Sequence, residues 1–191
     1  MISASQRRRI LASKNEAVVK LATELFGSDA PSPRGKVISQ YKQALSLSPD
    51  INRGEVVFRR ECLNCHRLGN EGYDVGPNLS TVRHRSAADV MANMLDPNRE
   101  VSPNYLEYAV ATVDGQVVTG TIAAETAASI TLRAAENKEQ TILCRDIDTI
   151  TNSGKSLMPE GIEQKMTPQQ MADLLAFVLG SGRLQNPSKV S

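Results

Sequence analysis

Cys62-Leu63-Asn64-Cys65-His66 brings two thiols and one imidazole together within a single turn of chain. Cysteines at this spacing can form thioethers with the two vinyl groups of a porphyrin, and the histidine that follows can bind the iron from one side. The pattern is typical of covalent c-type haem attachment. We therefore predict one haem c, attached through Cys62 and Cys65, with His66 as an axial ligand of the iron.

Two other uses of a C-x-x-C pair fit the sequence less well. A zinc site needs four soft ligands, and only Cys144 and His84 remain, far from the motif and from each other. A thioredoxin-like dithiol follows a strand, whereas the helix-like pattern of residues 54–61 precedes this motif. Cys144, left over once the haem takes two cysteines, is expected to be a small buried residue in a strand rather than a redox thiol.

The composition limits the partners and the core. The 191 residues are 40% hydrophobic and 23% charged with a formal net charge of +1, which argues against nucleic acid or an anionic membrane surface as a partner. Aromatic residues make up only 4% and tryptophan is absent, so a buried porphyrin would supply apolar surface that the side chains lack. No apolar run has the length of a transmembrane helix, and we expect no direct membrane insertion.

The prediction of covalent haem also predicts where the chain resides. Covalent attachment takes place on the outer side of the bacterial inner membrane, which favours a periplasmic or otherwise extracytoplasmic location. The first residues, Met1 to Arg9, lead into no apolar signal segment. We therefore expect the chain to be the end, or an excised part, of a longer protein.

Helical and strand patterns occupy separate blocks of the chain. Apolar residues at helical spacing, several of them preceded by capping residues, predict helices near residues 14–26, where Ser13 and Glu16 form a capping-box pattern, and near residues 37–45, 54–61, 87–95 and 168–179. Between the last two, β-branched runs separated by turns predict strands at residues 108–113, 117–122, 129–132 and 141–144. We expect four or five short antiparallel strands, curled into a sheet or partial barrel.

The sixth iron ligand decides the class of function, because a haem that only carries electrons usually has both axial positions filled. Met158 is the favoured candidate, since it stands in a non-helical loop, residues 156–161, just before the last helix. A His/Met pair raises the reduction potential relative to a His/His pair. The alternatives are an open site, His84, or another methionine, although the helical methionines are expected to fill the core. Those methionines are Met91, Met94, Met166 and Met171.

Several short motifs together resemble the class I cytochromes c. They are Cys62-Leu63-Asn64-Cys65-His66, Gly76-Pro77-Asn78-Leu79, Leu95-Asp96-Pro97-Asn98, Asp114-Gly115 to Gly120, and Ser156-Leu157-Met158-Pro159-Glu160-Gly161. More narrowly, residues from about Val37 to Gly180 are similar to the haem-binding domain of planctomycete and verrucomicrobial type. That domain lies at the C-terminus of large secreted, dehydrogenase-like multidomain proteins. The resemblance implies a fused or partner dehydrogenase, which no residue of this chain indicates by itself.

The resemblance and the patterns together give the expected fold class, which is mainly α. We expect a cytochrome c-like helical haem domain formed by residues 49–106 and 151–184. A helical N-terminal extension, residues 1–48, precedes it, and residues 185–191 form a disordered tail. A small antiparallel β insertion, residues 107–150, comes before the distal methionine loop. The resemblance also implies a close crossing of the two terminal helices, with Gly54 and Phe58 against Leu174 and Phe177.

Two further pocket roles follow from the resemblance and from charge. In c-type cytochromes the loop that resembles residues 76–79 orients the proximal histidine, so the carbonyl of Pro77 is expected to accept a hydrogen bond from the His66 ring. Arg85, or less favourably Arg83, could pair with a haem propionate. A solvated surface position is the alternative for both arginines.

The leading function is one-electron transfer through a covalently attached, His/Met-ligated haem, with no bond-making catalysis. Electrons are expected to come from a fused or partner dehydrogenase and to pass to another carrier. The alternative is a haem enzyme, or a gas or redox sensor, whose sixth ligand is labile. The β insertion could support the Met158 loop, or it could dock a partner or a second copy, so the oligomeric state stays open.

Overall fold

The computed structural model describes residue 10, residues 13–26 and residues 34–180. The expected tail, residues 185–191, lies outside these residues, as does part of the N-terminal extension. The chain divides into two units, Met1–Lys36 and Val37–Ser191. In the first unit, α2 spans Glu16–Phe26, and its first turn is capped by Asn15, whose Oδ1 accepts from the amide of Ala17 at 3.0 Å.

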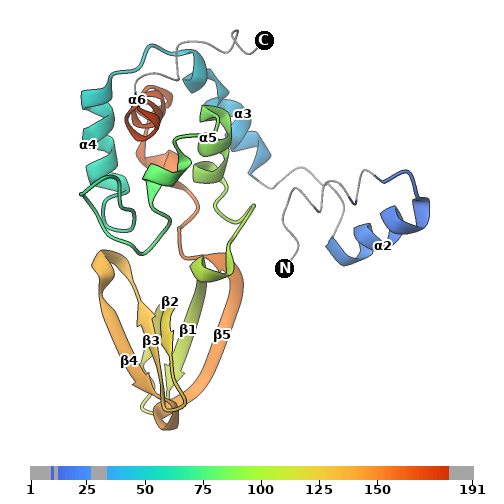
Figure 1. The fold of residues 1–191 in the computed structure, drawn as a ribbon, viewed down its shortest axis with the longest axis vertical. Helices are drawn as coiled ribbons and strands as arrows, with labels where there is room; N and C mark the ends of the chain where they lie inside the picture. Colours follow the sequence, from blue (N-terminus) through green and yellow to red (C-terminus); the bar gives the residue numbers. More distant parts are fainter. Residues whose placement is uncertain (1–9, 11–12, 27–33, 181–191) are drawn as a thin grey trace. The chain divides into compact units, whose positions relative to one another are not determined.

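The second unit combines a group of helices with a sheet (Figure 1). The α-helices that form its helical part are α4 (Ile51–Glu61), α5 (Ala87–Leu95) and α6 (Pro168–Leu179), preceded by α3 (Gly35–Tyr41) and the short η1 (Lys42–Ser46). Side chains cap the first turns of the three longer helices, because their leading amides have no partner inside the helix. The caps are Asp50, Ser86 and Thr167, the last in a reciprocal capping box with Gln170.

Helices α4 and α6 cross closely, as expected for Gly54, Phe58 and Phe177. A Cβ atom at Gly54 would lie only 2.0 Å from the carbonyl oxygen of Asp173, so glycine is what allows the two backbones to meet. The rings of Phe58 and Phe177 are 5.5 Å apart between centroids and tilted by 46°. This crossing anchors a core to which α5 and the side chain of Tyr41 also contribute.

The buried carboxylate of Asp173 also stabilises the crossing of α4 and α6. Asp173 is fully buried on α6 and accepts from the Nε and Nη2 atoms of Arg53 at 2.8 and 3.0 Å, from the amide of Asp50 at 2.7 Å and from Gln169 at 3.0 Å. Burial opposes the charge, but these donors outweigh it and lower the pKa of the Asp173 carboxyl below its ordinary value. The carboxylate therefore joins the start of α4 to α6.

The sheet has five antiparallel strands in the order β4-β3-β2-β1-β5. Their bounds are β1 Leu106–Thr112, β2 Val117–Glu125, β3 Ser129–Arg133, β4 Glu139–Leu143 and β5 Ile147–Ser156. A small apolar cluster, separate from that of the helices, packs on one side of the sheet and consists of Val110, Ile130, Leu132 and Ile142. Gly120 is needed here, since a Cβ atom would lie 2.5 Å from the carbonyl oxygen of Arg133.

The expected mainly-α fold class is wrong. The structure contains 44% helix and 24% strand, and the five-stranded sheet with its own apolar cluster makes the class mixed. The strands were expected to form only a small insertion, and none of the strands expected from the sequence covers the run that becomes β5. That run is almost wholly exposed and pairs only with β1, so it lacks the alternation of buried and exposed residues by which strands are recognised.

Hydrogen bonds join the sheet to the helical part in two places. At one end, β5 runs directly into the Met158 loop, and the amide of Ser156, the last residue of β5, donates to Oδ1 of Asn98 in the segment after α5 at 2.8 Å. At the other, the amide of Glu136, in the β3–β4 connection, donates to the carbonyl of Asn64 at 2.7 Å, inside the C-x-x-C-H motif. The sheet thus contacts both segments that carry the predicted iron ligands.

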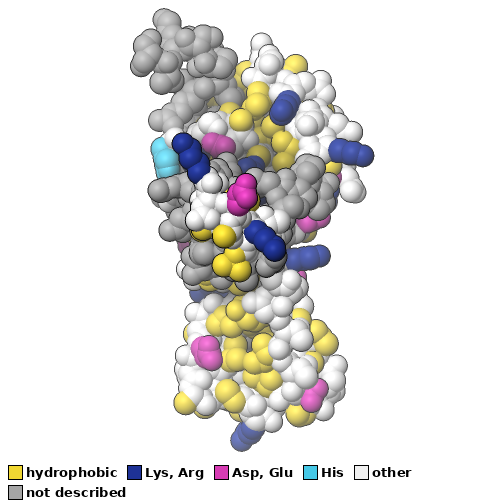
Figure 2. Space-filling model, turned by 90° about the vertical axis from the view of Figure 1, so that its right-hand side faces the viewer, with side chains coloured by type: hydrophobic (Ala, Val, Ile, Leu, Met, Phe, Trp, Pro, Cys, Tyr) yellow, Lys and Arg dark blue, Asp and Glu magenta, His cyan; other side chains and the backbone are white. Residues whose placement is uncertain are grey.

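Apolar side chains remain exposed on the sheet, where Figure 2 shows them gathered over the strands. The large ones are Val117, Leu143 and Ile150 on the strands, and Val113 in the turn after β1. None of the described helices is both long and apolar enough to cross a membrane.

Candidate haem site

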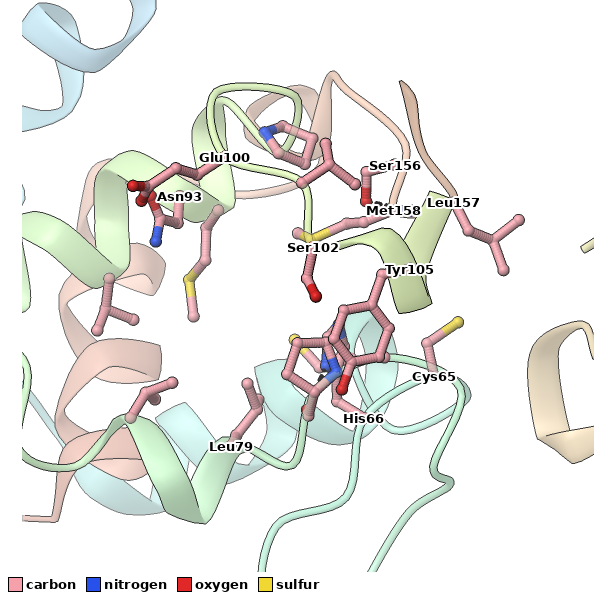
Figure 3. A pocket seen from close by; sticks show the side chains of 18 of the residues that line it. Cys65, His66, Leu79, Asn93, Glu100, Ser102, Tyr105, Ser156, Leu157 and Met158 are labelled. Carbon is pink, nitrogen blue, oxygen red and sulfur yellow. Dashed lines mark hydrogen bonds between the residues drawn. The ribbon is translucent and has the colours of Figure 1, made fainter. Parts of the chain in front are cut away.

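All the site residues expected from sequence line one pocket of the second unit. Those residues are Cys62, Cys65, His66, Pro77, Arg85 and Met158. His66 and Cys65 enter the pocket from one side and Met158 from the opposite side (Figure 3). The remaining lining is mostly apolar and includes Val75, Leu79, Val82, Val90, Met94 and Ile162. An apolar slot with two thiols and an imidazole along one wall fits the donor set that a covalently bound haem requires.

The C-x-x-C-H motif begins at the C-cap of α4, where Cys62 directly follows the last helical residue, Glu61. The amide of Cys62 donates to the carbonyl of Phe58 at 2.8 Å, and the amides of Cys65 and His66 both donate to the carbonyl of Cys62, at 3.1 and 2.9 Å. This tight turn brings both thiols and the imidazole to the same pocket. The crossing of α4 with α6, in turn, holds the helix from which the turn begins.

Both thiols of the motif are neutral at ordinary pH. Burial, followed by the nearby charges of Glu61 and Cys65, raises the pKa of Cys62 to about 12. Burial also raises the pKa of Cys65 above its ordinary value. Reactive dithiols and thiolate metal ligands have lowered pKa values, so this environment differs from that of a thioredoxin-like pair.

The His66 ring is held in one orientation. Its Nδ1 atom lies 2.9 Å from the carbonyl oxygen of Pro77, and because a carbonyl can only accept, Nδ1 carries the proton. The lone pair is then on Nε2, to which no group among the described residues is hydrogen-bonded. Burial lowers the pKa of His66, against the opposing effect of the Pro77 bond, so the ring is neutral, as iron ligation requires.

Two glycines shape the loop behind this ring. A Cβ atom at Gly76 would lie 2.4 Å from Cε1 of His66, so the bare backbone lies against the imidazole. Gly72 has a φ of +90°, and a Cβ atom there would lie 2.1 Å from the carbonyl oxygen of His66. Larger residues at either position would displace the histidine.

The structure separates the candidates for the sixth ligand by position. Met158 and Met94 line the pocket, Met158 from the loop after β5 and Met94 from α5. The other three candidate methionines are buried in the helical core and do not line the pocket; they are Met91, Met166 and Met171. His84 is exposed and does not line the pocket either.

The two arginines considered for a haem propionate, Arg85 and Arg83, also differ in whether they line the pocket. Arg85 lines the pocket, and the Asn93 amide, oriented with its oxygen toward the guanidinium, accepts from Nη1 and Nη2 at 2.9 and 3.0 Å. Arg83 is exposed and lies outside the pocket lining. Asn93 was not identified from the sequence, because a polar residue on an amphipathic helix gives no signal of which side chain it holds.

Cys144 is exposed in the short η5 (Cys144–Asp146), so the expectation of a buried strand residue is wrong. It falls in the connection between two edge strands, one residue beyond β4. In the described part of the chain, no cluster of three or more His, Cys, Asp or Glu side chains could hold a metal ion.

Comparison with known proteins agrees with the character of this pocket. No protein-family model matches the chain. A curated protein of Synechocystis sp. described as "Cytochrome c-553-like" is 32% identical over 72 residues, a match that covers 35% of this chain and 68% of that protein. The narrower resemblance to the planctomycete type finds no counterpart in this match. At this identity and coverage, the chain belongs to the cytochrome c family.

Proposed function

We propose that the chain is a one-electron carrier whose haem c is attached through Cys62 and Cys65 and ligated by His66 and Met158. The observation that carries the proposal is the convergence of these four side chains on one apolar pocket, from segments more than eighty residues apart in the sequence. A haem bound there would supply an iron that alternates between the ferric and ferrous states. The protein's contribution is to attach, orient and shield it.

The proximal residues fix one side of the iron. The Pro77 carbonyl accepts from His66 Nδ1 and directs Nε2 toward the ligand position, and the same bond makes the imidazole a stronger donor. Gly76 allows the backbone to lie flat against the ring. Because His66 cannot rotate freely, little reorganisation accompanies a change in the charge of the iron.

Met158 is proposed over Met94 for the distal side because of its surroundings. Met94 is 8% exposed and belongs to the packed helical core, so moving its sulfur would leave a void. Met158 stands on a loop, is only partly buried, and is held at the pocket edge by Ser156, whose Oγ accepts from the Met158 amide at 3.1 Å. A neutral thioether favours the ferrous state and raises the reduction potential.

Arg85 is proposed to neutralise a haem propionate. Its guanidinium lies at the pocket and is held there by Asn93. An arginine fixed in this way loses less side-chain entropy on pairing with a carboxylate than a free one.

The electron donor and the location are proposed from the resemblance and from the chemistry of haem attachment. The resemblance to domains fused to dehydrogenases favours a dehydrogenase as the electron donor, and covalent haem attachment favours an extracytoplasmic location. The small net charge of +1 gives no indication of a strongly charged partner.

The test is to express the chain together with a cytochrome c maturation system and to examine the purified protein. We expect a mass increase of one haem, a one-electron titration, and a weak ferric charge-transfer band at the red end of the visible spectrum that reports sulfur ligation. Met158→Ala should abolish the band and lower the potential. Met94→Leu is the matched control, because it removes a pocket sulfur from the core at nearly constant volume.

Three results would contradict the proposal. Retention of the band in Met158→Ala together with its loss in Met94→Leu would assign the iron to Met94. Rapid binding of CO by the unperturbed ferrous protein would indicate an open or labile sixth position and favour the sensor or enzyme alternative. Haem that is removed by acid and organic solvent from the wild-type protein would exclude thioethers at Cys62 and Cys65.

A further inference from the structure

The Met158 loop is held at both ends by a single side chain. Asn98 lies between α5 and β1, and its Oδ1 atom accepts from the amide of Ser156 at 2.8 Å, before Met158. Its Nδ2 atom donates to Oε1 of Glu160 at 2.5 Å, after Met158. The loop is therefore closed by one amide group that acts as acceptor on one side and donor on the other.

Further hydrogen bonds connect the Asn98 side chain to the backbone of Met158 through Ser156. Ser156 donates its amide to Asn98, and its Oγ accepts the amide of Met158 at 3.1 Å. The amide of Leu157 donates to the carbonyl of Tyr105, and Leu106 pairs with Ser156 across the end of the sheet. Moving the backbone of Met158 away from the pocket would require breaking this series of bonds, which begins at the Asn98 side chain.

We propose that Asn98 is a positioning residue that holds Met158 at the haem pocket and keeps other ligands from the iron. The proposal rests on the proposed function, in which Met158 is the sixth ligand. Asn98 does not itself line the pocket, so its effect on the iron is transmitted through Ser156 and Glu160.

An amide is the side chain that this place requires. Alanine would remove both bonds, and aspartate would keep the acceptor for the Ser156 amide but set one carboxylate against that of Glu160. Exchanging both groups restores the pattern, since in Asn98→Asp/Glu160→Gln the carboxylate accepts from the Ser156 amide and from the new amide side chain. Each of the two bonds contributes on the order of a tenfold change in the equilibrium between the closed and open loop.

The experiment uses the haem-loaded protein and its single and double variants. In Asn98→Ala and Asn98→Asp we expect a weakened methionine charge-transfer band and an affinity of ferric iron for added imidazole that rises about tenfold or more. Asn98→Asp/Glu160→Gln should recover most of the wild-type behaviour. In the ferrous protein, hydrogen exchange of the Met158 amide should be faster in Asn98→Ala, although Asn98 does not bond to that amide directly.

Asn152→Ala is the matched control. Asn152 lies on β5, and its Oδ1 accepts from the amide of Gly154 at 2.7 Å, so the substitution removes a similar bond from the same strand. It should leave the band, imidazole affinity and Met158 exchange unchanged. A substitution that only lowers thermal stability should leave these three readouts unchanged, whatever the size of the loss in stability.

The outcomes separate this inference from the proposed function. If Asn98→Ala leaves imidazole affinity and Met158 exchange at wild-type values, or if the control changes them equally, the positioning role is wrong. If the wild-type protein lacks the methionine band, the ligation by Met158 is wrong, and Met158 exchange alone then decides whether Asn98 closes the loop. Failure of the double variant to recover either readout would refute the donor and acceptor assignment at Asn98.

Discussion

Gly54→Ala should destabilise the protein by opening the crossing of α4 and α6. The added Cβ atom would lie 2.0 Å from the carbonyl oxygen of Asp173, 2.6 Å from its carbonyl carbon and 2.9 Å from the Cβ atom of Phe177. Two of these atoms belong to the backbone, so no rotamer change relieves the contact. The helices must separate by about 1 Å to restore van der Waals distances, and such a gap loses a quarter to a half of each dispersion contact.

Two opposing effects set the magnitude of the change. Alanine favours a helix over glycine by about 1 kcal/mol, whereas overpacking a core costs roughly 1–3 kcal/mol, with the upper end expected for a clash with backbone. The net loss in the free energy of unfolding is therefore about 2 kcal/mol, which lowers Tm by about 4–8 °C in a protein of this size. The Phe58–Phe177 contact should loosen with it.

Thermal and denaturant unfolding of the haem-loaded protein measure this loss. Val56→Ala, at a position on α4 that is 64% exposed, is the control and should change stability by less than about 0.5 kcal/mol. A Gly54→Ala protein as stable as the wild type would show that the helices do not approach as closely as the crossing requires. The reasoning from Gly54 to the position of the motif at the end of α4 would then be refuted.

Three more substitutions test separate parts of the structure. Asp173→Asn should cost about 1.5–3 kcal/mol near neutral pH by weakening the bonds from Arg53. Because folding lowers the pKa of Asp173, this stabilisation is fully present above the unfolded pKa and is lost as pH falls through the folded pKa. Acid unfolding curves of wild type and variant should therefore begin to approach each other below about pH 4 and coincide only below the folded pKa. Gly76→Ala should displace the His66 ring, whose Cε1 atom lies 2.4 Å from the added carbon, and a potential identical to wild type would contradict this. Leu132→Ala should lower the free energy of unfolding by about 2–4 kcal/mol, because Leu132 is buried in the sheet cluster. Amide exchange should become faster in the sheet than in α4 and α6. Equal acceleration in both would show that the two cores unfold together.

Local patterns predicted the helices of the second unit well. The capping residues Ser86 and Thr167 begin α5 and α6, and the glycine-containing crossing of α4 with α6 is present. Short-range rules suffice for these features, because a cap or an apolar stripe is encoded within a few residues. The same rules failed for β5, whose residues are mostly polar and mostly exposed and form a strand only because β1 lies beside them.

The candidate site divides along similar lines. The sequence motif identified Cys62, Cys65 and His66, and the position of a non-helical loop identified Met158; all of them line the pocket, while their roles toward a haem stay predictions. Asn98 is the last residue of Leu95-Asp96-Pro97-Asn98, a motif that supported the family resemblance but assigned no role to Asn98. Its partners lie about sixty residues further along the chain, and no local pattern records that an amide will bond to both ends of a distant loop.

The sequence by itself determined which donor groups the C-x-x-C-H motif brings together, because that set depends on residue types and spacing within one turn of chain. It also determined the helices, through caps and apolar periodicity. Only the tertiary structure decided that Met158 and His66 share a pocket, that a five-stranded sheet touches both of their segments, and that Asn98 closes the distal loop. These relations join residues far apart in the chain, and they arise only when burial of the two apolar cores brings their backbones together.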